Sequence, residues 1–214
     1  MDLIVTDATG KPVASHASYT LDLAFGSGEN DFDLQVEDAA LKAGSRIMID
    51  GTEYGGIIDD TDVDVDGGLS TVTWHGRDWH GVLASKIIEP DGNNDYLTLS
   101  GTIPVIMRTL VSRAGLQGLF TVTDESADRK TTCQFDRYVD LYSGLVKMLR
   151  ASGLKLRLRN DGDKVAMSAM PVRTIGDSID SDLIDFTAKQ AAHPINHLIC
   201  LGKGELKDRT VIHW

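Results

Sequence analysis

The densest group of side chains able to do chemistry is a run of five aspartates within eight residues: Asp59, Asp60, Asp62, Asp64 and Asp66. The last three, followed by Gly67, match the beginning of a calcium-binding loop, in which alternate carboxylates coordinate the ion. Such a loop needs a bidentate carboxylate at its twelfth position, which is Thr73 here, and a helix on each side. Both flanks alternate as strands do, so the segment is predicted to be a β-hairpin without bound calcium.

In this hairpin one strand runs from Ile57 to Val65, "DGG" makes the turn, and the second strand runs from Leu69 to Trp74. Successive side chains of a strand point to opposite faces. The aspartates at 62, 64 and 66 therefore share one face, and Val63 and Val65 share the other. The aspartates form a charged surface whose purpose depends on what it meets.

Other candidate sites have weaker patterns. His75 and His80 are too far from a third ligand at a recognised spacing to indicate zinc, so packing or solvent roles are favoured. Hydrolysis of sugars requires two carboxylates across a cleft. Glu53, Asp136 and Asp140 are possible members of such a pair, but nothing in the sequence indicates that any two converge.

Nucleophilic catalysis is not indicated either. The sequence has no G-x-S-x-G elbow, and Cys133 and Cys200 lie in apolar strand contexts that favour inert thiols. The glycines of "GKGE" do not follow a strand and open a helix, so they are not a phosphate cradle. We therefore expect no enzymatic activity, no cofactor and no metal.

Composition narrows the class of protein. The 214 residues are 42% hydrophobic and 25% charged, which is ordinary for a globular chain. A formal net charge of −11 argues against sequence-independent binding to nucleic acid and against docking on an anionic membrane, since both depend on Lys and Arg. The beginning of the sequence lacks the pattern of a signal peptide, and no apolar stretch is long enough to predict a membrane anchor.

The first part of the chain reads as short strands separated by turns. Leu21 and Leu23 alternate with Asp22, and Phe32 and Leu34 alternate with Asp33, as expected for half-buried strands. This region is predicted to be an antiparallel sheet or small barrel.

Beyond residue 76 the period changes to that of helices. Apolar stripes predict helices over 79–88, 103–114 and 138–152, with Asp78 and Thr102 as N-caps of the first two. "LKLRLRNDGDKVAMSAMPV" then predicts a β-hairpin around the turn "NDGD". Two more strands are expected around Lys203 and Gly204. The pattern stops abruptly at Trp214, so we expect a protein cut short.

Three segments together resemble a known family: "GTEYGGIIDD" followed by "WHGRDWHGVLASKIIEPDG", then "QFDRYVDLYSGLVKMLRASGLKLRLR", and "NHLICLGKGELKDRTVIH". They are similar to the hub-like tail proteins of long-tailed phages and prophages of Gram-positive bacteria. That family is related in fold to contractile-tail baseplate hubs and to type VI secretion spike hubs. The resemblance covers nearly all of the chain.

The resemblance implies an α+β fold: a tube-type β-barrel domain over 1–76, an α/β insertion of helices plus a hairpin over 77–192, and the start of a second β-barrel over 193–214. It implies a structural protein of the virion tail tip that adapts the tail tube to the tip and forms part of the exit channel. The implied partners are its own copies in a homotrimer, the tail-tube ring and the tape-measure protein.

Within that ring some of the five aspartates are expected to face the channel, where like charge repels DNA. Two other functions stay open: a tail-associated cell-wall hydrolase and a host-carbohydrate-binding module.

Overall fold

The computed structural model of the chain describes residues 1–24, 29–37, 41–123, 129–172, 199–201 and 211–213. The chain divides into two compact units, Met1–Arg173 and Thr174–Trp214. The secondary structure of the described residues is mixed, with mostly antiparallel strands and a few helices. This confirms the predicted α+β class.

The first part of the larger unit is one antiparallel sheet. Within the described ranges it contains seven strands in the order β2-β1-β5-β6-β7-β4-β3. Their bounds are β1 Leu3–Thr6, β2 Pro12–His16, β3 Thr20–Ala24, β4 Asp31–Gln35, β5 Arg46–Met48, β6 Gly55–Asp66 and β7 Leu69–Asp78.

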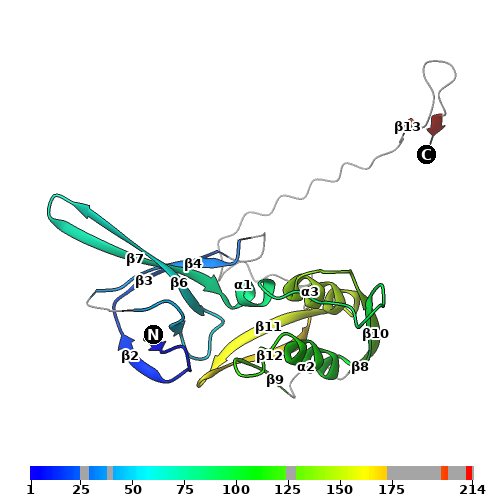
Figure 1. Cartoon of the computed structure of the whole chain (residues 1–214), viewed down its shortest axis with the longest axis horizontal. Coiled ribbons are helices and arrows are strands. Elements are labelled where there is room, and N and C mark those ends of the chain that lie inside the picture. The colour runs from blue at the N-terminus through cyan, green and yellow to red at the C-terminus, as the bar shows by residue number, and fades with distance from the viewer. Residues whose placement is uncertain (25–28, 38–40, 124–128, 173–198, 202–210, 214) are drawn as a thin grey trace, which may run out of the picture. The chain divides into compact units, whose positions relative to one another are not determined.

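The connection between β2 and β3 shows that this sheet is rolled. The two strands occupy opposite edges of the sheet, yet only the residues between His16 and Thr20 join them. Four Cα–Cα steps reach about 15 Å, whereas the edges of a flat sheet with this many strands are about 29 Å apart. The sheet must therefore curl until its edges approach each other (Figure 1). No pairing between β2 and β3 joins them in the part of the chain that is described, so closure into a barrel stays a prediction.

The inside of the rolled sheet holds a small apolar core. Its buried members are Leu3, Val5, Phe32, Leu34, Ile47, Ile49, Ile58 and Trp74. Gly56 and Gly76 lie beneath the ring of Phe32, where an added Cβ would come within 2.7 Å of ring carbons. Glycine at these two strand positions lets the ring lie against the backbone of β6 and β7.

An α/β part follows β7 directly and belongs to the same compact unit. Its elements are α1 Trp79–Ala84, β8 Leu97–Thr102, α2 Ile103–Arg113, β9 Phe120–Val122, β10 Lys130–Phe135, α3 Leu141–Ala151, β11 Leu154–Asp161 and β12 Lys164–Pro171. Strands β8 and β10 form one sheet, and β11, β12 and β9 form another, in which β9 runs parallel to β12.

The helices follow the predicted stripes with one correction. The predicted helix 103–114 is confirmed by α2, and 138–152 by α3, although α3 begins only after its N-cap Asp140. The prediction of a helix over 79–88 was wrong at its C-terminal end, because α1 ends at Ala84. Ile87 instead pairs with Asp140 in an isolated bridge, and Ile88 N donates to Val139 O at 2.8 Å. A contact distant in sequence thus overrides the helical stripe, and Ile87 is half exposed.

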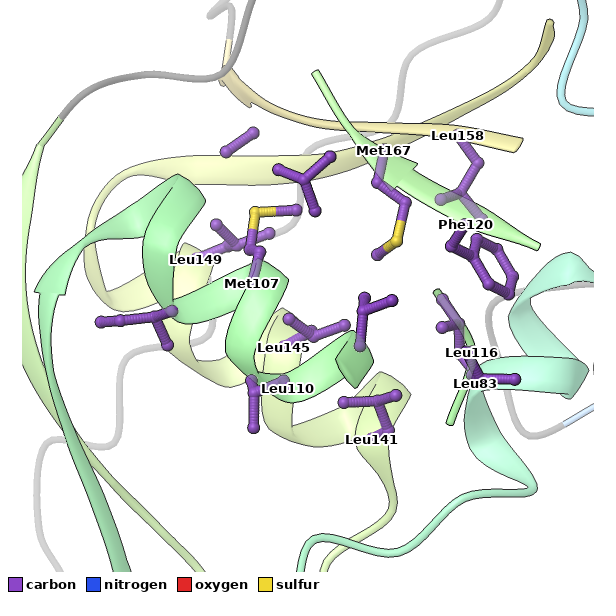
Figure 2. Close-up of a cluster of buried hydrophobic side chains, with 14 of the residues drawn as sticks. Leu83, Met107, Leu110, Leu116, Phe120, Leu141, Leu145, Leu149, Leu158 and Met167 are labelled. Carbon is purple, nitrogen blue, oxygen red and sulfur yellow. The ribbon is translucent and has the colours of Figure 1, made fainter. Parts of the chain in front are cut away.

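The α/β core is formed by two long helices packed on the β11–β12 hairpin. Figure 2 shows Met107 and Leu110 of α2 and Leu145 and Leu149 of α3 gathered on the side of the sheet that carries Leu158 and Met167. The hairpin itself was predicted. Its two-residue turn places Gly162 at φ +63°, a conformation that glycine adopts without strain.

Asn160, near the end of β11, joins the α/β part to the rolled sheet. Its side chain is buried, and all of its polar groups are bonded. Oδ1 accepts from Trp79 Nε1 at 2.8 Å, and Nδ2 donates to the carbonyls of Ile49 and Tyr54 at 3.0 and 2.8 Å. Its backbone N donates to Thr52 O at 2.6 Å, and its own carbonyl accepts from Gly51 N at 3.1 Å. The loop between β5 and β6 is thereby attached to α1 through one side chain.

Apolar contacts surround this junction. Trp79 is fully buried and meets the ring of Phe120 edge to face, at 6.4 Å between centroids. Met48 of β5 belongs to the α/β core, and Ile4 and Ile57 of the rolled sheet pack against it. The rolled sheet and the α/β part therefore share one apolar contact.

In the smaller unit β13 Ile199–Leu201 pairs antiparallel with β14 Val211–His213. The predicted turn at Lys203 and Gly204 lies outside the described residues, and the predicted domain boundaries at 76 and 192 stay predictions. Among the helices of the described ranges, none is long and apolar enough to cross a membrane.

Replacement of Asn160 by alanine tests the junction. Asn160→Ala leaves the Trp79 indole N–H and two backbone carbonyls without their partner, and we expect it to lower the free energy of unfolding by about 3 kcal/mol. Urea unfolding followed by tryptophan fluorescence measures this change. The exposed Asn93→Ala is the matched control, with an expected change within about 0.5 kcal/mol. Equal stability of the two variants would contradict the role given to Asn160.

Candidate functional site

The predicted acidic hairpin is present and extends out of the sheet. Beyond the row that pairs Thr61 with Trp74, the strands β6 and β7 pair only with each other, as far as the described residues show. We call residues 62–73 the arm; it projects away from the α/β part (Figure 1). Its turn consists of Gly67 and Gly68, both in the left-handed region at φ +57° and +86°, as a type I′ turn requires.

A β-bulge at Asp59 determines which side chains lie on which face of the arm. The register shifts between Ile58, which pairs with Gly76, and Asp60, which pairs with His75. The extra residue reverses the alternation of β6 relative to β7. The aspartates of the arm consequently lie on the outer face, together with His75.

Arg77 holds the bulge in place. Its Nε and one terminal nitrogen donate to the two carboxylate oxygens of Asp59 at 2.7 Å each, and its backbone N donates at 3.2 Å. The hydrogen bond from the guanidinium is the main reason why the pKa of Asp59 is lowered. Asp59 is therefore paired at the base of the arm and is not one of its free carboxylates.

The arm has two different faces. Asp62, Asp64 and Asp66 point to the outer face, and Val63 and Val65 point to the opposite one beside Val72. Val63 and Val65 are 63% and 67% exposed, although their face continues the inner face that carries buried Trp74. The arm thus extends the alternation of the sheet into solvent.

The outer acidic surface is wider than the sequence interpretation recognised. One register row crosses four strands and contains Asp22, Asp33, His75 and Asp60. Asp22, Asp31 and Asp33 were missed as members of this surface. The signal for them was present in the alternation of β3 and β4, where Asp22 and Asp33 each stand between inward-facing residues and Asp31 precedes buried Phe32.

His75 offsets part of this charge. Its Nδ1 donates to Asp33 Oδ1 at 2.6 Å, and its Nε2 lies 3.3 Å from Asp62 Oδ2 without the alignment of a hydrogen bond. The hydrogen bond to Asp33, helped by the charges of Asp33 and Asp62, raises the pKa of His75. A protonated imidazole between two carboxylates reduces the repulsion that like charges on neighbouring strands would cause.

His80, the other histidine considered, has the expected packing role. It is buried, its Nδ1 lies 2.9 Å from Asp78 Oδ2, and its ring meets Tyr142 edge to face. Asp78 is also the N-cap of α1, since its Oδ1 accepts from Gly81 N at 2.7 Å. The described residues contain no group of three or more His, Cys, Asp or Glu that could hold a metal ion.

The candidate catalytic carboxylates are not brought together by any observed contact. Asp136 pairs with Lys147 at 2.5 Å, and Asp140 caps α3 by accepting from Ser143 N at 2.8 Å. Glu53 lies in the loop between β5 and β6. Burial raises the pKa of the Cys133 thiol, which favours its unreactive form. Cys200 lies in β13.

Comparison with known proteins gives a likeness of fold. No family model matches the sequence, and no curated protein matches it. A solved structure of a tail protein from Neisseria meningitidis MC58 is similar at a TM-score of 0.53 and 19% identity, over 78% of this chain and 49% of that one. The chain thus spans about half the length of that protein.

A second solved structure, the 43 kDa tail protein of prophage MuSo2 from Shewanella oneidensis, is similar at a TM-score of 0.49 and 17% identity, over 78% of this chain and 52% of that one. At such identities the likeness concerns the fold. The hub position and the bacterial group implied by the sequence resemblance stay predictions.

Titration of His75 by NMR tests the electrostatics of the outer face. We expect its pKa to lie above 6.5, and Asp33→Asn to lower it more than Asp62→Asn does. Because the folded-state pKa is raised, this interaction stabilises the fold fully below about pH 6.5 and is lost as the pH rises through the folded-state value. Asp95→Asn, in the exposed loop before β8, is the control. A pKa of His75 at or below 6.5 would contradict the arrangement.

Calorimetric titration with calcium tests the prediction made from the aspartate spacing. Carboxylates of one strand face are held about 7 Å apart, too far to converge on one ion. We expect no site tighter than about millimolar, the weak end of calcium-loop affinities. Micromolar binding that disappears in Asp64→Asn would show that the prediction is wrong.

Proposed function

We propose that this chain is a structural, non-enzymatic component of a phage or prophage tail. The proposal is carried by the likeness of fold to the Neisseria tail protein, which extends over 78% of the chain. The resemblance of three sequence segments to hub-like tail proteins supports the same class. Asp136 is paired with Lys147, Asp140 caps α3 and His80 is buried, and each of these is a structural role.

Within that class, the proposed position is the hub at the tail tip, where the whole protein adapts a sixfold tail tube to a threefold tip. The rolled sheet leaves β2 and β3 as edge strands in the described part of the chain. Closed rings cover such edges between subunits. A homotrimer that presents two barrels per subunit would match a sixfold tube. Its proposed partners are the tube ring and the tape-measure protein.

The acidic outer face has a role in this proposal. A channel for DNA benefits from a wall that repels phosphate. The row from Asp22 to Asp60 and some of the aspartates of the arm are proposed to lie at the channel or its rim. Asp59 contributes less to that repulsion, because its carboxylate is paired with Arg77.

Light scattering of the whole protein tests the ring. A homotrimer at micromolar concentration is the expected result. Asp95→Asn, an exposed change outside the arm, is the control and is expected to leave the trimer intact. A stable monomer or dimer of the unaltered protein would rule out the proposed ring.

The position in the particle and the rival functions are tested separately. Electron microscopy of the parent particle with this protein labelled is expected to place the label at the tail tip. A zymogram on host cell walls is expected to show no clearing. Clearing would favour the hydrolase, and specific retention on a glycan array would favour the carbohydrate-binding module.

A further inference from the structure

The arm has an unpaired edge as well as two exposed faces. Strand β6 pairs with β5 only through Gly55 to Ile57, and Ile58 bonds to Gly44 and Ser45. Beyond Ile58, no strand in the described ranges pairs with that edge. A two-stranded ribbon is marginally stable in water by itself. The arm therefore gains from a third strand that would also cover Val63 and Val65.

Strand β11 has a complementary edge. Among the described residues it is the outer strand of its sheet, and the loop between β5 and β6 contacts its free edge near Asn160. Lys155 and Arg157 are exposed and lie on one face with Arg159, and leucines lie on the other face. The described residues supply no ion-pair partner to Lys155 or Arg157.

The two edges match in charge, in period and in apolar character. In the arm, aspartate alternates with valine; in β11, a cation alternates with leucine. When two strands pair, side chains of like orientation lie side by side on the same face. Pairing would place Asp64 and Asp66 beside Lys155 and Arg157 on one face. It would place Val63 and Val65 beside Leu156 on the other face. Leu156 is only partly buried, at the margin of the α/β core.

The two edges do not meet within one chain. They belong to different sheets of the same unit, and the arm projects away from the α/β part that carries β11 (Figure 1). A contact between them must therefore involve two copies. It joins different surfaces of each copy, which is a head-to-tail contact, and such contacts form a ring where the rotation between copies closes.

We propose that the arm of one copy adds as a strand to the free edge of β11 in the next copy, with cross-strand ion pairs between Asp64 or Asp66 and Lys155 or Arg157. This inference rests on the proposed ring of copies, and it names the contact that builds the ring. Asp62 keeps its ion pair with His75, and the acidic row at the base of the arm takes no part in the contact.

Charge reversal in the whole protein tests the contact. The arm variant carries Asp64→Lys and Asp66→Lys, and the β11 variant carries Lys155→Glu and Arg157→Glu. Each is expected to weaken self-association at least about tenfold in sedimentation velocity, since it sets like charges opposite each other. The chain with both pairs reversed has the original net charge and is expected to regain association.

A matched control separates the contact from net charge. Glu29→Lys with Asp95→Lys changes two exposed sites elsewhere by the same charge as the arm variant and is expected to leave association unchanged. Circular dichroism verifies that every variant is folded. Added salt is expected to weaken the self-association of the unaltered protein and of the doubly reversed chain to the same extent.

The outcomes distinguish this contact from the proposed ring. If the unaltered protein associates and the arm variant and the β11 variant associate equally well, the proposed contact is wrong while the ring stands. In that case the cations of β11 serve only to prevent other strands from pairing with this edge. If the reversals weaken association and the doubly reversed chain does not regain it, the pairing between these strands is wrong. If the unaltered protein does not associate, the proposed ring fails.

Discussion

One buried amide connects the two halves of the larger unit. Asn160 bonds the indole of Trp79, two carbonyls of the β5–β6 loop and, through its backbone, the loop itself. A buried side chain with every donor and acceptor satisfied defines one geometry, because any displacement leaves polar groups without partners. The apolar contacts of Met48 and Ile57 supply area at this junction, but area alone does not select an orientation. The placement of the rolled sheet beside the helices therefore depends on this residue.

The bulge at Asp59 is the second constraint, since it determines the chemistry of the arm. Without the extra residue, the alternation that buries Ile58 would carry the aspartates of the arm to the inner side of the sheet. The pairing of Asp59 with Arg77 holds that irregularity, and the result is an arm with an acidic and an apolar face. The proposed contact between copies uses both faces, so a single inserted residue underlies it.

Local patterns predicted much of this fold. The alternation and glycine turns of both long hairpins, the stripes of α2 and α3, and the cap at Asp78 are all properties of neighbouring residues. From the sequence, Asn160 was predicted only as a turn residue, because its side-chain hydrogen-bond partners are more than 80 residues away in the chain. The end of α1 was misplaced for the same reason, since Ile87 pairs with Asp140. The wider acidic surface needed the strand order, which no local pattern contains.

The long hairpin has a mechanical consequence. Strand β6 begins immediately after Tyr54, and β7 ends immediately before Trp79; both of these residues bond to the side chain of Asn160. The glycine turn at the tip of the arm is therefore connected, through two continuous strands, to the two residues that this one amide bonds. Tension applied at the tip is carried equally by the covalent backbones of both strands, so it does not shear one strand against the other. A pull on the turn is thus transmitted to Tyr54 and Trp79 together, and from them to the side chain of Asn160.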